Sequence, residues 1–359
     1  TGEVTAKGLV ERIGEAGAPA ADHSAAITIM NTALTDAGAD LTELRAVGHR
    51  VVHGGPEFSD PVIIDDAVLA EISDLIPLAP LHNPGAVAGI QAARSEFAVP
   101  HVAVFDTAFF ATLPAAASTY AIPADLALTH RIRRYGFHGT SHRFVSGAAA
   151  TLVGRDLADL NQIVLHLGNG CSASAIRGGV AIETSMGLTP LQGLVMGTRS
   201  GDVDPGLHTF LHNELGLSVG DIDNLLNKQS GLKGLAGVND FRELEERRSS
   251  GDRAAQLAFD VYVHRLKHYV GAYLAALGSL DVLSFTAGVG ENNPALRSAV
   301  LEGLDGLGLS VDPERNETPS RDARVISPDG APTTVAVVPT NEELAIAREA
   351  VALLAAQTD

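Results

Sequence analysis

Several short runs of β-branched and apolar residues end at clustered glycines, and this pattern limits the folds that the chain can adopt. Such runs lead into the glycines at 54–55, 168–170 and 288–290. A short apolar run bounded by turn residues predicts a buried strand. Glycine directly after a strand permits a tight turn and a close approach of the backbone to a ligand. We therefore expect sheets whose strand ends carry the binding sites.

The expected strands are 47–52, 99–105, 163–167, 172–176, 180–183, 280–286 and 334–338. Two short glycine turns separate the three strands between 163 and 183, so we expect a hairpin across 168–170 followed by a third strand. Residues 253–277 are expected to form a long amphipathic helix, with Gly278 as its C-terminal cap. Its apolar side chains near helical spacing are Leu257, Val261, Leu266, Val270 and Leu274. These elements predict a mixed α/β fold with hairpins and strand–turn–helix units in the same domain.

The length and charge of the chain narrow its organisation and its partners. At about 150 residues per domain, 359 residues suggest two domains, and the best boundary lies near residue 107. Lys and Arg number 25 against 43 Asp and Glu, a formal net charge of −18. This excess of acidic residues argues against nucleic acid or an anionic membrane surface as the main partner. No uncharged stretch is apolar enough to be expected to span a membrane.

Cys171 is the single cysteine of the sequence. It excludes an intramolecular disulfide and a zinc site built from several thiolates, and it suits the reducing cytoplasm. No catalytic base motif adjoins Cys171, so we interpret it as a small packing residue.

Two glycine loops are candidates for binding phosphate. HLGNG (166–170) occupies the expected hairpin turn, and AGVGEN (287–292) joins a strand to a helix. Both could direct backbone N–H groups at an anion, and the second adds a helix N-terminus. Neither fits the Walker or Rossmann pattern, so each alone is explained more simply by a tight hairpin or a helix cap. Two such loops in one domain favour a nucleotide.

Charged residues at strand ends and in loops form a second set of candidates. Arg50 interrupts an apolar strand, and Arg199 lies in the glycine-rich loop 196–206. Guanidinium groups bind carboxylate and phosphoryl groups, but a buried ion pair for Arg50 and a solvated loop charge for Arg199 explain them equally well. Asp106 ends a buried strand, at the edge where α/β folds bind ligands, although an Asp there also suits a helix N-cap.

The histidines allow two interpretations. His138 and His142 have the i, i+4 spacing of zinc ligands on a helix, but no third ligand follows and Gly139 weakens the helix. His138 as a hydrogen-bond donor to a developing charge is favoured, and His166 could line the same site. His53, His82 and His101 are expected to be satisfied polar residues.

Asn341 is expected to cap a helix that runs to about residue 355. Glu342, in the first turn of that helix, could hold Mg²⁺ together with nucleotide phosphates. Complementarity to the helix dipole explains its position equally well.

Taken together, these strings resemble the acetokinase family, in the superfamily of acetate and sugar kinases, heat-shock chaperones and actin. The matching strings occur in the order of the family and span nearly the whole chain. They are HRVVHGG (49–55), PLAPLHNP (77–84), VFDTAFF (104–110), RRYGFHGTSH (133–142), HLGNGCS (166–172), MGLTPLQGLVMGTRSGDVDPG (186–206), DFR (240–242), AGVGEN (287–292) and PTNEE (339–343).

The resemblance implies that Arg50 and Arg199 bind the acetate carboxylate and the transferring phosphoryl group, and that His138 stabilises the transition state. Asp106 would be the catalytic acid/base or would position acetate, and Glu342 would ligate Mg²⁺, with Mn²⁺ as an alternative. The implied pocket for the methyl group consists of Val52, Leu81, Phe137 and Pro190. The implied ATP contacts are His166, Leu167, Gly168, Asn169 and Gly170 at the phosphates, with Asp240, Phe241, Arg242, Gly288, Val289, Gly290, Glu291 and Asn292 around the adenosine.

The resemblance also implies two duplicated actin-like (ribonuclease-H-like) α/β domains around a central cleft, in a homodimer. Residues 1–107 with 344–359 would form the N-terminal domain, and 108–343 the nucleotide-binding domain. The family begins with a strand and turn of the form NxGSSSxK, and no NxGSSS string occurs in this sequence. We therefore expect the sequence to start downstream of that strand.

The implied reaction is the reversible, Mg²⁺-dependent, in-line transfer of the γ-phosphoryl group of ATP to acetate, giving acetyl phosphate and ADP. Three alternatives stay open at this point. They are a propionate or butyrate kinase of the same family, a nucleotide-binding but inactive truncated form, and a metallohydrolase that uses the histidines.

Overall fold

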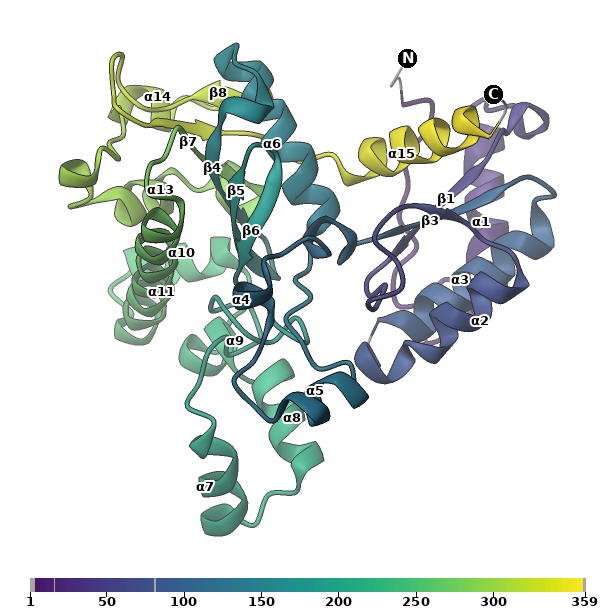
Figure 1. Ribbon diagram of the computed structural model, residues 1–359, viewed down its shortest axis with the longest axis horizontal. Helices are drawn as coiled ribbons and strands as arrows, with labels where there is room; N and C mark the ends of the chain where they lie inside the picture. The colour runs from purple at the N-terminus through teal and green to yellow at the C-terminus, as the bar shows by residue number, and fades with distance from the viewer. Residues whose placement is uncertain (1–3, 16, 81, 358–359) are drawn as a thin grey trace. The chain divides into compact units, whose positions relative to one another are not determined.

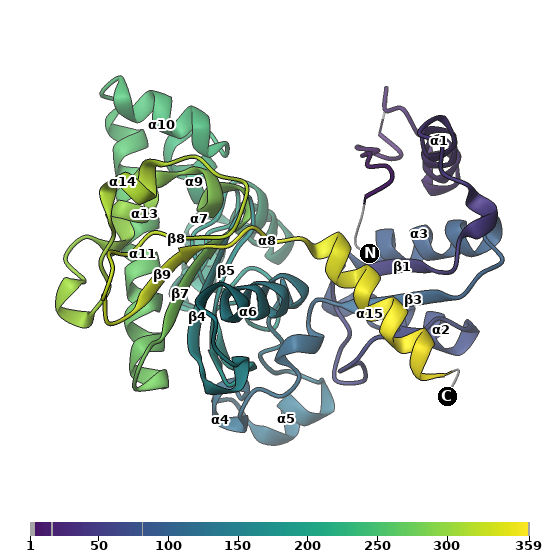
Figure 2. The same cartoon turned by 90° about the horizontal axis from the view of Figure 1, so that it is seen from above.

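The computed structural model describes residues 4–15, 17–80 and 82–357. The chain forms two compact units, Thr1–Ala108 with Asn341–Asp359 (unit 1) and Phe109–Thr340 (unit 2). Figure 1 and Figure 2 show a separate sheet in each unit. Among the described residues, no helix is long and apolar enough to cross a membrane.

Unit 1 is built on a three-stranded sheet of order β1-β3-β2. Strand β3 (His101–Phe105) is parallel to β1 (Val47–Val51) and antiparallel to β2 (Val62–Ile63). The sequence predicted the β3 strand from residue 99, but it begins after Pro100, which has no N–H for a ladder hydrogen bond. The helices of unit 1 are α1 (His23–Asp36), α2 (Asp66–Asp74), α3 (Asn83–Glu96) and α15 (Glu342–Ala356), with 3₁₀ turns η1 (Leu41–Glu43) and η2 (Ile76–Leu78).

Alternate residues of β3 face two different hydrophobic clusters. Ala103 and Phe105 pack in the cluster that includes residues of α2 and α3. Val102 and Val104 pack against Ala350 of α15. This alternation is the period-2 geometry of a strand, and helices cover both faces of the sheet (Figure 2). Every residue of β3 is therefore buried.

Unit 2 is built on a six-stranded sheet of order β6-β5-β4-β7-β9-β8. Its strands are β4 (Asn161–Leu167), β5 (Cys171–Arg177), β6 (Val180–Thr184), β7 (Val282–Thr286), β8 (Arg324–Val325) and β9 (Thr334–Val337). The predicted hairpin across 168–170 and its third strand are confirmed, since β4, β5 and β6 form an antiparallel meander. Strand β7 lies parallel to β4 and to β9.

The helices of unit 2 are α4 (Ala115–Ser118), α5 (Ala124–Thr129), α6 (Gly139–Val153), α7 (Gly206–Leu215), α8 (Val219–Lys228), α9 (Gly231–Ala236), α10 (Phe241–Ser249), α11 (Arg253–Leu277), α12 (Ala287–Asn292), α13 (Pro294–Leu301) and α14 (Pro313–Glu317). Three 3₁₀ turns complete the elements: η3 (Ala108–Phe110), where the chain passes into unit 2, η4 (Leu157–Asp159) and η5 (Asp305–Leu307).

Helices α6 and α11 cover opposite faces of the unit 2 sheet (Figures 1 and 2). On β5, Cys171 bonds Tyr262 of α11, whereas the next residue, Ser172, bonds His142 of α6. The bounds predicted for α11 are confirmed, but the predicted apolar face is wrong in part, because Leu257 is 56% exposed. Small and aromatic residues, such as Ala258 and Tyr262, form much of the buried face instead.

Candidate active site

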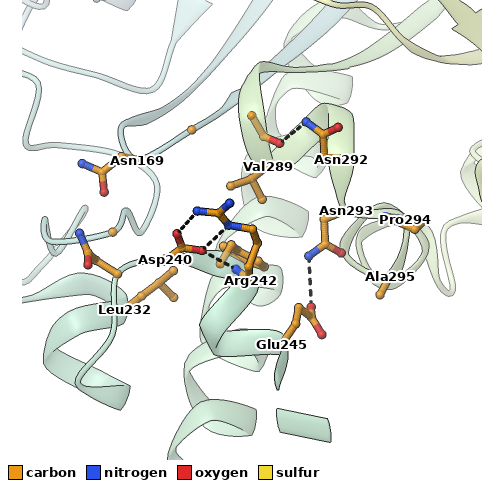
Figure 3. A pocket seen from close by; sticks show the side chains of 15 residues that line it. Asn169, Leu232, Asp240, Arg242, Glu245, Val289, Asn292, Asn293, Pro294 and Ala295 are labelled. Atoms are coloured by element: carbon orange, nitrogen blue, oxygen red, sulfur yellow. Dashed lines mark hydrogen bonds and ion pairs between the residues drawn. The ribbon is translucent and has the colours of Figure 1, made fainter. Parts of the chain in front are cut away.

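A cavity of about 730 Å³ opens in unit 2 beside the ends of β4 and β7 (Figure 3). Because these strands are parallel neighbours, the turns that follow them meet at one edge of the sheet. Eight residues of the predicted nucleotide set line the cavity: Gly168, Asn169, Asp240, Phe241, Arg242, Gly288, Val289 and Asn292. Three separate sequence motifs therefore converge on one pocket.

The cavity wall also contains residues that the sequence reasoning missed, namely Gly197, Leu232, Asn239, Glu245, Asn293, Pro294 and Ala295. Most of them adjoin predicted motifs. Asn239 precedes DFR, and 293–295 follow AGVGEN directly. Extending each motif by one helical turn could have found Glu245 and Ala295.

The DFR motif forms the start of α10. Asp240 caps this helix by accepting from the backbone N–H of Arg242 at 2.8 Å, and its carboxylate also pairs with the Arg242 guanidinium. These hydrogen bonds lower the pKa of Asp240 to about 2. Phe241 is buried, with its ring edge-to-face on Tyr262 at 5.0 Å, so it anchors the motif in the core under the pocket.

The remaining predicted nucleotide residues lie outside the lining of this cavity. Leu167 is fully buried in the sheet. The carboxylate of Glu291 accepts from the backbone N–H of Thr340 at 3.2 Å. Gly290 packs against the backbone of Phe285. Gly170 lies against Arg199, and His166 belongs to the neighbouring polar cluster, both described below.

Arg297 of α13 fixes the end of the AGVGEN helix, and no sequence pattern pointed to it. It is 1% exposed, and its guanidinium donates to the carbonyls of Gly290 and Glu291 at 2.9 and 3.0 Å. It also donates to both oxygens of Asn316. Burial lowers the pKa of Arg297 to about 10. The position of the α12 wall of the pocket thus depends on a buried cation.

Arg199 lies against the glycine turn between β4 and β5. A Cβ on Gly170 would stand 2.6 Å from its Nη2 atom and 3.4 Å from ring atoms of His138. Its Nη1 donates to the carbonyl of Pro190 at 2.7 Å, and burial lowers the pKa of Arg199. The arginine is therefore half-buried at the turn, and the alternative of a freely solvated loop charge is wrong.

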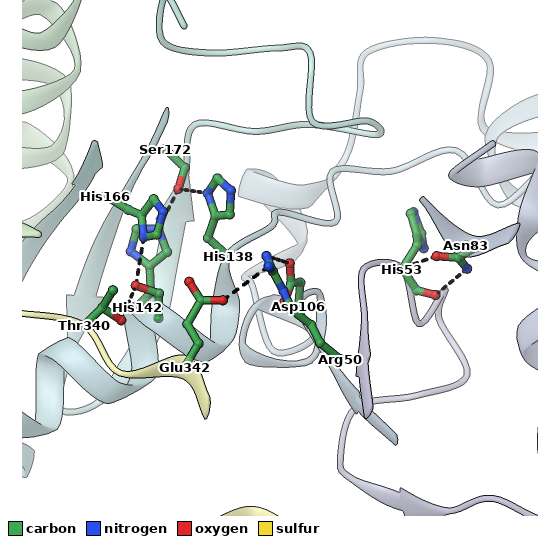
Figure 4. Close-up of polar contacts among 11 residues, drawn as sticks. Arg50, His53, Asn83, Asp106, His138, His142, His166, Ser172, Thr340 and Glu342 are labelled. Carbon is green, nitrogen blue, oxygen red and sulfur yellow. Dashed lines mark hydrogen bonds and ion pairs between the residues drawn. The ribbon is translucent and has the colours of Figure 1, made fainter. Parts of the chain in front are cut away.

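Histidines and serines form a connected polar cluster beside that turn (Figure 4). His138 stacks on His166 with ring centroids 4.2 Å apart. The hydroxyl of Ser172 bonds Nδ1 of His138 at 2.9 Å and Nε2 of His142 at 2.7 Å. Nδ1 of His166 bonds the Ser141 hydroxyl at 2.8 Å.

The zinc interpretation of the FHGTSH motif fails on this geometry. Gly139 does not break the helix, because α6 begins at Gly139 with His138 in the left-handed region at φ 60°. His142 is fully buried, and both of its ring nitrogens bond serine hydroxyls, those of Ser172 and Ser174. Burial holds the pKa of His142 well below its usual value, so His142 is a neutral, fully bonded residue.

Unit 1 brings together three predicted residues from distant parts of the chain (Figure 4). Arg50 of β1 donates to both carboxylate oxygens of Asp106 at 2.9 and 2.7 Å, and Asp106 is 1% exposed. Nη1 of Arg50 lies 3.4 Å from a carboxylate oxygen of Glu342 at the start of α15. Asp106 raises the pKa of Arg50, whereas burial raises the pKa of Glu342 against the pull of Arg50. The ion pair expected as one interpretation of Arg50 is therefore present, but it is buried only on the side of Asp106, because the Arg50 side chain is 41% exposed.

The proposed methyl pocket is distributed over both units. Val52 is half-buried in unit 1, Leu81 lies outside the described residues, and Phe137 and Pro190 belong to unit 2. That pocket stays a prediction. In unit 1, His53 accepts from the N–H of Gly55, and His101 bonds His49 at 2.8 Å.

Comparisons with known proteins define the class. The model of the acetokinase family matches residues 5–348. An acetate kinase of Leifsonia xyli subsp. xyli is 57% identical, over 99% of this chain and 94% of the relative. An acetate kinase of Clavibacter michiganensis subsp. michiganensis is 56% identical, over 99% and 94%.

Two solved structures agree. The crystal structure of the Porphyromonas gingivalis acetate kinase is 44% identical, with a TM-score of 0.89 over 93% of this chain and 86% of that one. A propionate kinase from Francisella tularensis is also 44% identical, with a TM-score of 0.86 over 91% and 83%. The chain belongs to the acetokinase family, and the predicted α/β fold class is confirmed.

Proposed function

We propose that this protein is an acetate kinase, an ATP:acetate phosphotransferase that forms acetyl phosphate and ADP reversibly. The observation that carries the proposal is the convergence of the 168–170, DFR and AGVGEN motifs on one cavity beside Arg199 and His138. The curated relatives at 55–57% identity over nearly the whole chain are acetate kinases, which supports the same reaction.

The cavity suits a nucleoside. Its wall combines an apolar surface from Leu232, Val289 and Pro294 with a few polar groups, which is the usual composition of a small-molecule site. The turn at 168–170 then lies where the phosphates would follow, with Arg199 beside it. We infer that unit 2 is the nucleotide-binding domain and that unit 1 is the domain that contributes Arg50 and Asp106. Unit 1 resumes at Asn341, so Glu342 belongs to unit 1, whereas the predicted boundary after residue 343 had placed it in the nucleotide-binding domain.

Phosphoryl transfer to a carboxylate depends on positioning and charge neutralisation, since the transition state is loose and carries charge on its equatorial oxygens. Arg199 and Arg50 would orient the acetate carboxylate and the phosphoryl group, and His138 would donate a hydrogen bond to the developing charge. Asp106 holds Arg50 through two hydrogen bonds, and so would fix the geometry of attack.

The half-buried carboxylate of Glu342 fits a magnesium ion. Mg²⁺ prefers oxygen ligands and is usually held by one or two carboxylates with substrate phosphates. The raised pKa of Glu342 shows that burial and Asp106 outweigh the stabilisation that Arg50 gives this carboxylate, and a divalent ion would supply positive charge. Glu342 would hold the ion, and Mg²⁺, or Mn²⁺ in its place, would neutralise phosphate charge when bound.

A propionate kinase is the second candidate, because a propionate kinase is among the similar structures. One methylene changes binding by only about 1–3 kcal/mol in an apolar pocket, so activity on both acids is expected. The residues of the predicted methyl pocket, Val52, Leu81, Phe137 and Pro190, would set the preference. We further propose a homodimer, and a cytoplasmic location because the single cysteine is free and buried.

The test is a hydroxylamine trap for acyl phosphates with ATP, Mg²⁺ and acetate, and with propionate and butyrate in parallel. Arg199→Ala should lose most of the activity, because each donor to the transition-state charge is worth about 10²–10³ in rate. Arg177→Ala, which removes a surface arginine from the same unit, is the matched control. Nucleotide binding without acyl phosphate from any acid would instead favour the inactive module, and near-normal turnover of Arg199→Ala would refute the site.

A further inference from the structure

We propose that Ser172 is a positioning residue which, together with buried His142, fixes the tautomer of His138 so that its Nε2 carries the proton. His138 would then donate from Nε2 as a neutral ring. This inference rests on the proposed function, which requires His138 to donate a hydrogen bond. Its central claim is the tautomer of the ring, which can be measured without following the enzymatic reaction.

The first step is the hydrogen count at Ser172. Its hydroxyl lies between two imidazole nitrogens, 2.9 Å from Nδ1 of His138 and 2.7 Å from Nε2 of His142. A hydroxyl has one hydrogen and can donate to one of them only. The other imidazole must donate to the Ser172 oxygen, so the two rings cannot both present a bare nitrogen to it.

The second step concerns His142. It is fully buried, and burial together with His166 keeps its pKa well below the usual value, so it carries a single N–H. Its Nδ1 bonds the Ser174 hydroxyl at 2.7 Å. If Ser174 donates to Nδ1, then Nε2 of His142 carries the hydrogen and donates to Ser172. Among the described residues the Ser172 hydroxyl bonds these two rings alone, so its own hydrogen has an acceptor only if it donates to Nδ1 of His138. If every bond is reversed, His138 must carry its hydrogen on Nδ1.

The third step chooses between these two chains by the donation from Nε2 of His138 that the proposed function requires. In the reversed chain, Nε2 of His138 could donate only if the ring were a cation. One cation lies close by, because Nη2 of Arg199 and ring atoms of His138 border the same glycine, Gly170. A like charge nearby disfavours the protonated ring. A neutral donor at Nε2 therefore requires a bare Nδ1, and Ser172 must supply the hydrogen to it.

The local fold explains how this chain of hydrogen bonds (the Ser172 relay) holds the His138 ring. His138 is the N-cap of α6 and has a left-handed backbone, while Ser172 and Ser174 are neighbours on the same face of β5. The serines sit in the antiparallel ladder with β4, so the hydroxyls are fixed by the sheet and the imidazoles by the helix.

The experiment uses the full chain labelled with ¹⁵N-histidine, with the His138 signals assigned by their loss in His138→Gln. The ¹⁵N shifts and two-bond ¹H couplings distinguish a bare Nδ1 from a protonated one. Steady-state kcat and KM are measured for Ser172→Ala, for Ser172→Thr, which keeps the hydroxyl, and for Ser284→Ala. Ser284 is an equally buried serine on β7, and its hydroxyl has no hydrogen-bond partner among the described residues.

We expect a neutral His138 with protonated Nε2 in the wild-type protein at neutral pH, and a mixture of tautomers in Ser172→Ala. That variant should lose about tenfold to a hundredfold in kcat with little change in the KM for ATP, the size of the loss when a hydrogen bond that orients a metal-bound imidazole is removed. Ser172→Thr should recover most of the loss, and Ser284→Ala should match the wild type.

A proton on Nδ1 of wild-type His138, or a cationic ring at neutral pH, would overturn the proposal. So would an unchanged kcat for Ser172→Ala. If the wild type makes no acyl phosphate at all, the proposed function fails, while the spectrum still decides the tautomer.

Discussion

Replacing Gly170 with alanine should disable the site while leaving the fold intact. The new Cβ would stand 2.6 Å from Nη2 of Arg199, whereas ordinary van der Waals contact begins near 3.4 Å. Gly170 does not have a positive φ, so alanine fits its backbone without strain. The clash falls on the far end of a flexible side chain, and the guanidinium would retreat by about 0.8 Å.

A retreat of this size would stretch the 2.7 Å hydrogen bond from Arg199 to the Pro190 carbonyl. It would also displace the guanidinium from the position that it needs in the transition state. A misplacement of about 1 Å can cost 10²-fold in rate, which corresponds to about 2.7 kcal/mol of transition-state stabilisation. We therefore expect Gly170→Ala to lower kcat about a hundredfold and to change the free energy of unfolding by less than about 0.5 kcal/mol.

The assay is acyl phosphate formation together with urea unfolding for Gly170→Ala and Gly147→Ala. Gly147 lies in α6, and a Cβ there meets nothing within 4 Å, so this control adds the same methyl group without touching the site. A fully active Gly170→Ala would refute the placement of Arg199. Equal loss of activity and of stability would show that the effect arises from the fold.

Three further predictions concern stability and reactivity. Burial and His101 lower the pKa of His49 to about 4 from the ordinary 6.5. As the pH falls, the unfolded state therefore takes up a proton at this residue before the folded state does. The free energy of unfolding should fall by at most about 3 kcal/mol between pH 6.5 and pH 4. His49→Gln should flatten that part of the pH profile in urea unfolding, and an unchanged profile would exclude His49 as its source. Arg297→Met leaves four acceptor sites in the core without their donor. It should lower the free energy of unfolding by about 3–5 kcal/mol. A melting temperature near that of the wild type would show that other contacts hold the pocket wall. Cys171 is fully buried, and burial raises its pKa to about 11. Iodoacetamide should therefore label Cys171 in urea but not in the native protein. Rapid labelling of the native protein would contradict the observed packing.

Local sequence patterns predicted those parts of the structure that are determined by interactions between residues close together in the chain. The hairpin at 168–170 follows from its turn glycines, and the C-terminal end of α11 from Gly278. The structure adds Asp252 as the N-cap of α11, which had not been predicted from the sequence. The buried face of α11 did not follow, because a list of aliphatic residues overlooked Tyr262, whose hydroxyl bonds Cys171 across the sheet. Burial is decided by what packs against a helix, and that partner is distant in sequence.

The candidate site shows the same limit. Arg50, Asp106 and Glu342 could each be selected from the sequence, but their contact depends on β1 and β3 being parallel neighbours and on α15 packing against both. Arg297 could not be found in this way, because one arginine in an apolar helix looks like an exposed residue until its four hydrogen bonds are seen. Ser172 was part of a matched string, but its function in the relay depends on a helix that precedes it in the chain.

The position of α15 has a consequence for how the protein is made. This helix completes unit 1 by covering Val102 and Val104 of β3, yet the ribosome synthesises it after every residue of unit 2. Domains generally fold as units in the order in which they emerge, but here the first sheet stays uncovered on one face while the whole second unit is being translated. Unit 2 can therefore complete its fold on the ribosome before unit 1, and the early, exposed sheet is the part of the nascent chain most in need of a chaperone.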